Sequence, residues 1–314
     1  MKVIVTGSAG YIGGQVALQL RDAGHEVYGI DRREPPAHLR GVVYRFLYKD
    51  FASDVAIDWI KSLKPDAIIH CAGTSLVGPS VTDPSEYYNN NVVKTVKMLD
   101  MVRTSLPNTR VIFSSSASVY GIPFMNPCHE VDLREPISPY GESKMMIEMV
   151  LEAYHRAYNL DYVNFRYFNA CGADPEARHG QEPGATHIIA RVLESIRDQQ
   201  AFTLYGSDYP TDDGTCVRDY VHVDDIARAH VMALDSKIPA GIYNLGSNTG
   251  TSNREIIAAA EAVTGKPVQV AAGSQRAGDP AILVASADKF SALAEWRKYE
   301  LTDMVKHAWA WYVR

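Results

Sequence analysis

Two short segments contain residue types that could perform acid–base chemistry, 114-SSSASVYG-121 and 138-SPYGESK-144. In the second, Tyr140 and Lys144 are four residues apart, so in a helix both side chains lie on one face. A free tyrosine titrates at about 10, and holding it as a phenolate at pH 7 requires roughly 4 kcal/mol from its surroundings. The Lys144 ammonium supplies part of this, a cationic cofactor could supply more, and a hydroxyl of Ser116 or its neighbours could share the proton. The spacing therefore predicts a general base, although tyrosine and lysine are also common as an ordinary surface pair of a helix.

The residues around this pair predict that it lies in the first turn of a helix. Ser138 suits the cap position, Pro139 the first helical position and Glu142 the positive end of the helix dipole. Gly141 argues mildly against a helix, because glycine has a low helix propensity. We expect the helix near residues 141–158.

The N-terminal segment predicts a site for a dinucleotide. Apolar runs at 2–6 and 27–31 are typical of buried strands, and an amphipathic helix lies between them. The turn after the first run contains Gly7, Gly10 and Gly13. Glycines there allow close approach of the backbone to a pyrophosphate, whose charge meets the helix N-terminus. Because the triplet lies between a strand and a helix and an acidic residue ends the next strand, the pattern is strong.

That acidic residue, Asp31, favours NAD over NADP. A carboxylate at the end of the second strand accepts hydrogen bonds from the ribose hydroxyls and repels a 2′-phosphate. Arg32 and Arg33 follow and could attract such a phosphate, but we interpret them as a solvated loop because the carboxylate comes first.

Strands and helices continue to alternate as far as residue 168. Strands are expected at 42–48, 67–73, 110–116 and 161–168, and helices near 54–63, 84–105 and 141–158. This alternation predicts an α/β fold with a doubly wound parallel sheet. Ligands of such sheets bind beyond the carboxyl ends of the strands. We therefore expect one binding edge, formed by Gly7, Asp31, Asp50, 71-CAG-73, the serines 114–116 and Asn169.

After about residue 169 the pattern loosens, and Gly, Pro and Asp become frequent. Short strands are expected at 201–206, 241–245 and 268–272. We predict a Rossmann domain that binds NAD at 1–168 and a smaller α/β substrate domain at 169–314, with segments of the latter returning to the sheet. Arg218 follows a long loop and is of the type that forks onto phosphates, although a salt bridge fits the sequence equally well.

Composition excludes several classes of protein. The net charge is −6 and no basic cluster occurs, so nucleic acid is not an expected partner. No run of 18 apolar residues is present and no signal peptide precedes the first strand, so we expect no membrane span and no secretion. The four cysteines are far apart and form no C-x-x-C, which argues against a disulfide framework or a metal site and fits a reducing cytoplasm.

These motifs together resemble the extended short-chain dehydrogenase/reductase superfamily, which combines G-x-x-G-x-x-G, a distal serine and Y-x-x-x-K. Within it, the chain is similar to the UDP-glucose 4-epimerase family over essentially its whole length. The segments that carry the resemblance are 4-IVTGSAGYIG-13, 87-YYNNNVV-93, 113-FSSSASVYG-121, 138-SPYGESK-144, 166-RYFNACGADP-175, 208-DYPTDDGTCVRDYVHVDD-225, 243-YNLG-246 and 276-RAGDPA-281.

The resemblance implies a role for each matching residue. Tyr140 would be the base, Lys144 would tune it and hold the nicotinamide ribose, and Ser116 would help with the proton. The residues that would contact NAD are Gly7, Gly10, Tyr11, Ile12, Gly13, Asp31, Arg32, Asp50, Phe51, Cys71, Ala72, Gly73, Ser75, Asn91, Ser114, Tyr140, Lys144 and Phe168. The residues that would contact the UDP-sugar are Ser116, Tyr140, Asn169, His187, Ile188, Thr203, Tyr205, Arg218, Arg276, Asp279 and Leu283. The resemblance also implies a homodimer.

Three positions depart from the family pattern or leave alternatives open. Many members have a lysine where this chain has Ser75, which concerns a cofactor contact and not the reaction. The loop between the serines and Tyr140 differs in length, so the choice of Ser116 over Ser114 or Ser115 is an inference. The residue that tests sugar size falls at about Leu283, or at a direct neighbour if the alignment slips by one.

The implied reaction is the interconversion of UDP-glucose and UDP-galactose at C4, with NAD as a bound tool. A UDP-pentose or UDP-N-acetylhexosamine 4-epimerase is an alternative. A sugar-nucleotide dehydratase usually has an acidic triplet before V-Y-G, whereas this chain has 116-SAS-118 without a carboxylate. A decarboxylase of the same superfamily is a further rival. A non-catalytic NAD-binding protein on the same fold is the rival from another class, and the presence of both Tyr140 and Lys144 argues against it.

Overall fold

The computed structural model describes residues 1–275 and 279–314, and the chain forms two compact units. The first unit comprises Met1–Gly121, Leu133–Arg166 and Ala227–Tyr243. The second comprises Ile122–Asp132, Tyr167–Ile226 and Asn244–Arg314. Because the chain crosses between the units several times, they do not correspond to two continuous segments, and the domain boundary expected after residue 168 stays a prediction.

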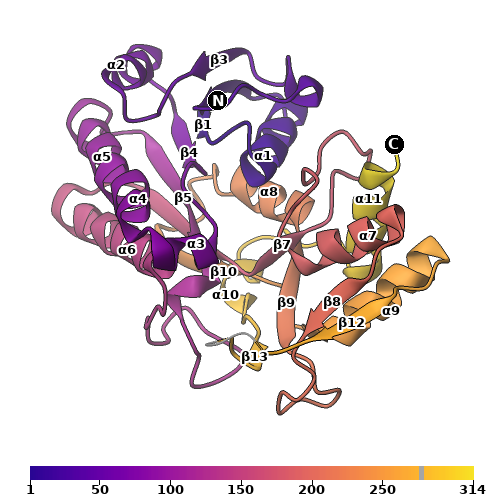
Figure 1. Cartoon of the computed structure of the whole chain (residues 1–314). Helices are drawn as coiled ribbons and strands as arrows, with labels where there is room; N and C mark the ends of the chain where they lie inside the picture. Colours follow the sequence, from indigo (N-terminus) through magenta and orange to yellow (C-terminus); the bar gives the residue numbers. More distant parts are fainter. Residues whose placement is uncertain (276–278) are drawn as a thin grey trace. The chain divides into compact units, whose positions relative to one another are not determined.

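The first unit contains a seven-stranded sheet in the order β10-β6-β5-β4-β1-β2-β3 (Figure 1). The pairings from β3 across to β5 are all parallel, which confirms the predicted doubly wound α/β fold. The strands are β1 (Lys2–Thr6), β2 (Glu26–Asp31), β3 (Arg45–Tyr48), β4 (Ala67–His70), β5 (Arg110–Ser116), β6 (Tyr162–Tyr167) and β10 (Gly241–Leu245). The segment 241–245 thus extends this sheet next to β6, as a segment that returns to it.

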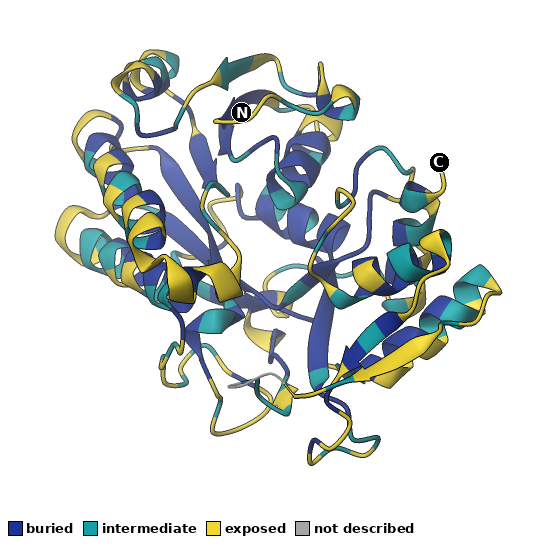
Figure 2. Cartoon of the chain, in the orientation of Figure 1, coloured by how far each residue is buried: buried dark blue, intermediate teal, exposed yellow. Residues whose placement is uncertain are grey.

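Helices cover both faces of this sheet. The helices α2 (Asp54–Leu63), α5 (Lys94–Ser105) and α6 (Pro139–Tyr158) share a hydrophobic core with one face of the strands. Helix α1 (Tyr11–Asp22) packs against β1 and β2 on the other side, and Figure 2 shows these strands buried while outward helix faces are exposed. Apolar, β-branched residues fill β1 and β4, as expected of parallel strands covered on both faces.

The segment 84–105, expected as one helix, forms three consecutive elements. Helix α4 (Pro84–Tyr87) leads into a π-helix, η2 (Tyr88–Val93), and then into α5. A π-helical turn inserts one extra residue, so the periodicity of the sequence does not show it. Short elements complete the first unit, namely α3 (Val77–Thr82), η1 (Ala37–Leu39), η3 (Ala117–Val119) and the part of α8 (Val223–Met232) that follows residue 226.

The second unit contains small sheets and a helical layer of its own. Strand β9 (Val217–His222) pairs with β7 (Asn169–Cys171), β11 (Gly250–Ser252) and β13 (Ile282–Leu283). Strand β8 (Phe202–Tyr205) pairs in parallel with β12 (Val270–Gly273). The helices α7 (Ile188–Asp198), α9 (Asn253–Thr264) and α11 (Leu301–Tyr312) enclose a second core, and α10 (Asp288–Ser291) is a single short turn. No helix within residues 1–275 and 279–314 has the length and apolarity to cross a membrane.

A buried histidine links three elements of the first unit. His70, at the end of β4, contacts Thr6 Oγ1 through Nδ1 at 2.7 Å and Thr95 Oγ1 through Nε2 at 2.9 Å. Burial, and next the positive charge of Lys144, lower the pKa of His70 from 6.5 to about 3. The ring is therefore neutral in the folded state over a pH range in which an unfolded histidine is charged.

We expect His70 to make stability depend on pH below about 6.5. As the pH falls from 6.5 towards 3, the unfolded chain binds a proton that the folded chain does not bind at this site, so stability is lost. The slope from one such group is at most about 1.4 kcal/mol per pH unit. Urea unfolding at pH 4 to 7 should show a smaller slope for His70→Gln than for the parent. Parallel curves for the two proteins would contradict this assignment.

Candidate active site

Helix α6 starts as the sequence predicts. Ser138 is its N-cap, and the Ser138 Oγ accepts a hydrogen bond from Gly141 N at 3.2 Å, while Pro139 opens the first turn. Gly141, the residue that argued against a helix, is required by packing. A Cβ at this position would lie 2.5 Å from the backbone oxygen of Ser118, so only glycine lets α6 approach the η3 turn this closely.

Lys144 is buried one turn beyond Tyr140 on the same helix. Only 5% of the residue is exposed, and its Nζ donates a hydrogen bond to the Ser114 carbonyl at 2.8 Å. The ammonium lies 4.9 Å from the centroid of the Phe113 ring and 5.8 Å from that of Tyr140. Burial lowers the pKa of Lys144 to about 8, against the opposing influence of Cys71 and Glu148. The residue therefore places a cation near the Tyr140 ring at neutral pH.

The chain alone keeps the Tyr140 hydroxyl protonated. Burial raises the pKa of Tyr140, a hydrogen bond with the Ser116 side chain lowers it, and the neighbouring Tyr87 raises it again. The upward shift is opposite to what a phenolate needs. Ionisation near pH 7 would thus require a further positive charge beside the ring.

The hydroxyls of the three successive serines have different partners. Ser114 Oγ donates to Cys71 Sγ at 3.1 Å, and Ser115 Oγ donates to the Glu148 carboxylate at 2.6 Å. Ser116 makes the hydrogen bond with Tyr140 and lies 3.1 Å from Ser118 Oγ. Among these three hydroxyls, that of Ser116 is the one bonded to Tyr140.

The glycine turn between β1 and α1 has the close packing that its motif predicts. Gly7 has φ +73°, and a Cβ there would lie 2.7 Å from Ala72 N. A Cβ on Gly13 would lie 2.2 Å from the Gly7 carbonyl oxygen. Gly10 is the N-cap of α1, and no side chain of the described residues caps this helix. The first turn of α1, with the half-buried Tyr11 and Ile12, therefore suits an anionic group such as a pyrophosphate.

Asp31 joins this turn to the end of β2. Its carboxylate accepts hydrogen bonds from Ala9 N at 3.0 Å and from Arg33 N at 2.9 Å. The residue is buried, whereas Arg32 and Arg33 are exposed, as expected of a solvated loop. A fixed carboxylate with lone pairs remaining fits the ribose diol of NAD.

The register of the sheet aligns several predicted residues at one edge. Thr6 is opposite both Ile30 and His70, and His70 is opposite Phe113. The residues that directly follow these strand positions are therefore neighbours. They are Gly7, Asp31, Cys71 and Ser114, and Ala72 and Gly73 continue from Cys71.

Asp50, Phe51, Ser75 and Asn91 surround this edge in the first unit. Asp50 accepts hydrogen bonds from Lys94 Nζ at 2.7 Å and Ala52 N at 3.0 Å, and Phe51 packs edge-on against His70. Ser75 is exposed. The Asn91 amide accepts from Thr74 N at 2.8 Å and donates to Thr74 O and Ser143 Oγ, both at 3.0 Å. Asn91 thus ties the loop after β4 to α6.

Apart from Ser116 and Tyr140, the predicted substrate residues lie in the second unit, where three of them are close together. Arg218 donates to Asp279 Oδ1 at 2.5 Å and to the Val217 carbonyl at 2.8 Å, and Leu283 pairs with Arg218 across β13 and β9. Asn169 Nδ2 donates to the Asp219 carbonyl at 2.9 Å. Among the described residues, the structure does not place the others in contact with Arg218, and they are His187 and Ile188 at the start of α7 and Thr203 and Tyr205 on β8. Phe168, a predicted NAD contact, directly precedes β7. Arg276 lies outside the described residues.

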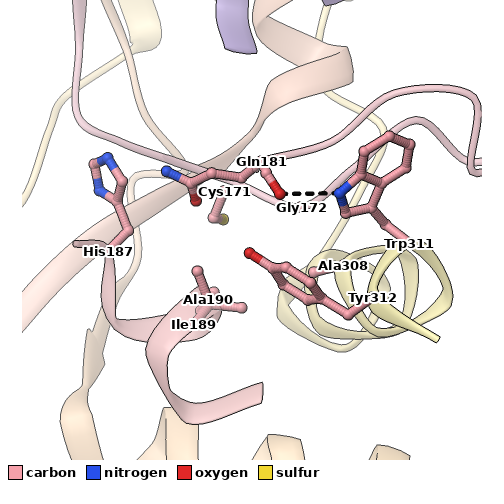
Figure 3. Close-up of a pocket in the computed structure, with 9 residues that line it drawn as sticks. All are labelled: Cys171, Gly172, Gln181, His187, Ile189, Ala190, Ala308, Trp311 and Tyr312. Atoms are coloured by element: carbon pink, nitrogen blue, oxygen red, sulfur yellow. Dashed lines mark hydrogen bonds between the residues drawn. The ribbon is translucent and has the colours of Figure 1, made fainter. Parts of the chain in front are cut away.

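A small cavity lies beside the start of α7 in the second unit. It is lined by Cys171, Gly172, Gln181, His187, Ile189, Ala190, Ala308, Trp311 and Tyr312 (Figure 3). The Trp311 Nε1 donates to the Gln181 carbonyl at 2.9 Å, and the Tyr312 hydroxyl points inward without a hydrogen-bond partner in the described residues. At about 10 Å³ it has room for roughly one water molecule and not for a nucleotide.

Two charged residues of the first unit were missed from the sequence. Lys94 pairs with Asp50, and Glu148 lies one turn beyond Lys144 on α6. The four-residue spacing after Lys144 was a visible signal for Glu148, whereas the partner of Lys94 is 44 residues away. In the described part of the chain, no group of three His, Cys, Asp or Glu side chains could hold a metal ion.

The sequence is similar to a known protein family and, over nearly its whole length, to individual relatives. The model of the NAD dependent epimerase/dehydratase family matches residues 3–246. The UDP-glucose 4-epimerase of Halalkalibacterium halodurans is 39% identical over 322 residues, which cover 99% of this chain and 96% of that protein.

The fold is also similar to solved structures of 4-epimerases. The UDP-glucose 4-epimerase from Brucella ovis in complex with NAD superposes with a TM-score of 0.92 at 37% identity, over 98% of this chain and 97% of that one. The UDP-Glc/GlcNAc 4-epimerase from Campylobacter jejuni has a TM-score of 0.84 at 32% identity, over 99% and 98%. The matched family is NAD-dependent, in agreement with the cofactor expected from the glycine turn and Asp31. From its sequence and its fold, the chain belongs to the NAD-dependent epimerase/dehydratase family.

Proposed function

We propose that this protein interconverts UDP-glucose and UDP-galactose by inverting the configuration at C4 of the sugar. The observation that carries the proposal is the group formed by Tyr140, Ser116 and Lys144 next to the strand ends that bear the glycine turn and Asp31. A hydroxyl-bonded tyrosine with a buried cation nearby is suited to move a proton on and off a sugar hydroxyl.

The glycine turn and Asp31 would hold NAD, which would supply the means to accept a hydride from C4 and to return it. In the proposed reaction Tyr140 takes the proton of the 4-hydroxyl, and Ser116 shares it through their hydrogen bond. Lys144 holds a positive charge 5.8 Å from the centre of the Tyr140 ring. Because burial raises the pKa of Tyr140, the tyrosine becomes a base only when more positive charge is brought near it. This requirement links proton removal to the oxidised state of the cofactor.

Inversion also requires a sugar that can turn over while the nucleotide stays fixed. Arg218 and Asp279 in the second unit are proposed to contact the UDP portion, together with Asn169, the start of α7, β8 and Arg276. Arg218 is buried and held by Asp279, so its guanidinium is preorganised for a diphosphate. The remaining NAD contacts proposed from the sequence are those of the glycine turn, the loop after β4 and Phe168.

One rival reaction, dehydration of the sugar nucleotide, receives less support. A dehydratase needs a carboxylic acid next to the catalytic serine, whereas residues 116–118 present two hydroxyls 3.1 Å apart. A UDP-pentose 4-epimerase would use the same proton and hydride transfers, so it stays an alternative. The homodimer implied by the resemblance is also a proposal, which the exposed side chains of Val93 and Met149 on the contacting elements η2 and α6 support.

The first test is to incubate the purified protein with UDP-galactose, without added NAD, and to measure UDP-glucose. We expect conversion, and we expect Tyr140→Phe to lower kcat by about 100-fold or more while UDP-sugar binding survives, as is typical of acid–base groups. Tyr154→Phe is a matched control on the same helix. It removes a tyrosine hydroxyl that donates to Asp100 at 2.9 Å and has no part in the proposed proton transfer.

Three results of this test would count against the proposal. A parent that converts no UDP-sugar would refute the proposed function, and dependence on added NADP would refute the cofactor assignment. Near-normal turnover of Tyr140→Phe would show that another residue is the base.

We expect Leu283 to limit the size of the sugar. A leucine is smaller than the tyrosine of members restricted to unsubstituted hexoses but larger than the serine or cysteine of those that accept N-acetyl sugars, and an acetamido group needs room in both orientations of the ring. The parent should therefore prefer UDP-galactose over UDP-N-acetylgalactosamine, and should accept UDP-pentoses. Leu283→Ser should shift the ratio of kcat/KM values towards the N-acetyl sugar by roughly 1–3 kcal/mol.

The control is Ile282→Ser, because consecutive residues of β13 point to opposite sides of the strand. The size argument fails if the parent is equally efficient on both sugars. If Ile282→Ser shifts the ratio of kcat/KM values and Leu283→Ser does not, Ile282 is the residue that limits the size of the sugar.

A further inference from the structure

Glu148 is a buried carboxylate of α6 to which the proposed reaction gives no part. It is fully buried, one turn beyond Lys144 and two turns beyond Tyr140, so the three side chains follow one face of the helix. A carboxylate is rarely placed out of water unless cations and hydrogen-bond donors satisfy it.

Glu148 has such partners on two neighbouring strands. Arg166 on β6 donates from Nε to Oε1 at 2.9 Å and from Nη2 to Oε2 at 2.7 Å. Ser115 on β5 donates to Oε1 at 2.6 Å, and Arg134 approaches Oε2 at 3.3 Å. The forked ion pair anchors the carboxylate, and the short bond to Ser115 connects that anchor to the strand with the serines.

The end of β5 is thereby attached to α6 at three successive residues. Ser116 bonds to Tyr140, the Ser114 carbonyl accepts from Lys144, and Ser115 donates to Glu148. Arg166 also donates to the Tyr120 hydroxyl at 2.8 Å, which anchors the end of the η3 turn that follows Ser116. A shift of the strand along the helix would therefore separate Ser116 from Tyr140.

We propose that Glu148 is a positioning residue, which acts through Ser115 to hold the strand end so that Ser116 stays hydrogen-bonded to Tyr140. This inference rests on the proposed function of Tyr140 and Ser116. Glu148 touches neither substrate nor cofactor in the proposed reaction, and Arg166 serves to hold its carboxylate in place. Glu148 also acts on Lys144: its negative charge raises the pKa of Lys144, whereas burial lowers it.

The central variant is Ser115→Ala, which removes the connection to the strand and leaves the Glu148–Arg166 ion pair intact. We expect kcat to fall at least fivefold while the KM for the UDP-sugar stays within twofold, because misplacement affects the chemical step and not nucleotide binding. The matched control is Thr109→Val, which removes a buried hydroxyl bonded to the Pro65 carbonyl at 2.6 Å just before β5. The melting temperature of Thr109→Val should fall by about as much as that of Ser115→Ala, but its kcat should equal that of the parent.

Tyr140→Phe provides the readout that a merely structural role would not change. If Ser115 acts through the bond between Ser116 and Tyr140, Ser115→Ala should lower kcat less than twofold in the Tyr140→Phe background. Glu148→Gln should lower kcat at least as much as Ser115→Ala, and the double variant should be no slower than Glu148→Gln alone. If Glu148→Gln does not fold, the Ser115→Ala series still decides.

The proposal is overturned if Ser115→Ala lowers kcat less than fivefold, or if it lowers kcat equally in the parent and in Tyr140→Phe. It is also overturned if the factors by which Ser115→Ala and Glu148→Gln lower kcat multiply in the double variant. An inactive parent would be a failure of the proposed function. An active parent whose Ser115→Ala variant loses less than fivefold in kcat would be a failure of this inference alone.

Discussion

The arrangement of the first unit depends on the burial of two opposite charges one turn apart on α6, the Lys144 ammonium and the Glu148 carboxylate. Neither charge is stable out of water without partners at short distance. The partner of Lys144 is a carbonyl of β5, and those of Glu148 are a hydroxyl of β5 and a guanidinium of β6. These contacts fix the helix against two parallel strands, and Tyr140 takes its position from the same helix.

The opposite side of the proposed NAD site is fixed by close packing and not by charge. Gly7 lets the turn after β1 approach the residues that follow β4, and Gly13 lets the first turn of α1 approach the end of β1, where any Cβ would collide with backbone. Asp31 then ties this turn to β2 through the amide of Ala9. A rigid cradle for an anion and a rigid group of acid–base residues therefore lie along one sheet edge, and the electrostatics connect them. The tyrosine is held protonated by the protein, and the cationic ring of a cofactor whose pyrophosphate occupies the cradle would supply the missing positive charge.

Local patterns were sufficient to predict the fold of the first unit and the residues of its edge. The glycine motif, Asp31 and the Tyr140–Lys144 spacing each act within a few residues, which is the range that sequence periodicity covers. Contacts made by distant partners were not predictable in this way. The ion pair of Glu148 with Arg166 and the place of β10 beside β6 depend on tertiary pairing. The π-helix at 88–93 lies inside a segment whose pattern reads as one helix, yet it carries Asn91, whose amide orders the loop after β4.

The fate of the hydrogen at C4 distinguishes two ways of inverting the sugar. In the proposed reaction Tyr140 moves a proton, while the hydrogen of C4 leaves and returns as a hydride. The measurement uses UDP-galactose that carries deuterium at C4, converted in ordinary water and analysed by mass spectrometry of the UDP-glucose formed. We expect the product to retain its deuterium, because in the proposed reaction that hydrogen never exchanges with solvent. Loss of the deuterium to water would show that C4 is inverted by proton abstraction, and it would contradict the proposed hydride transfer.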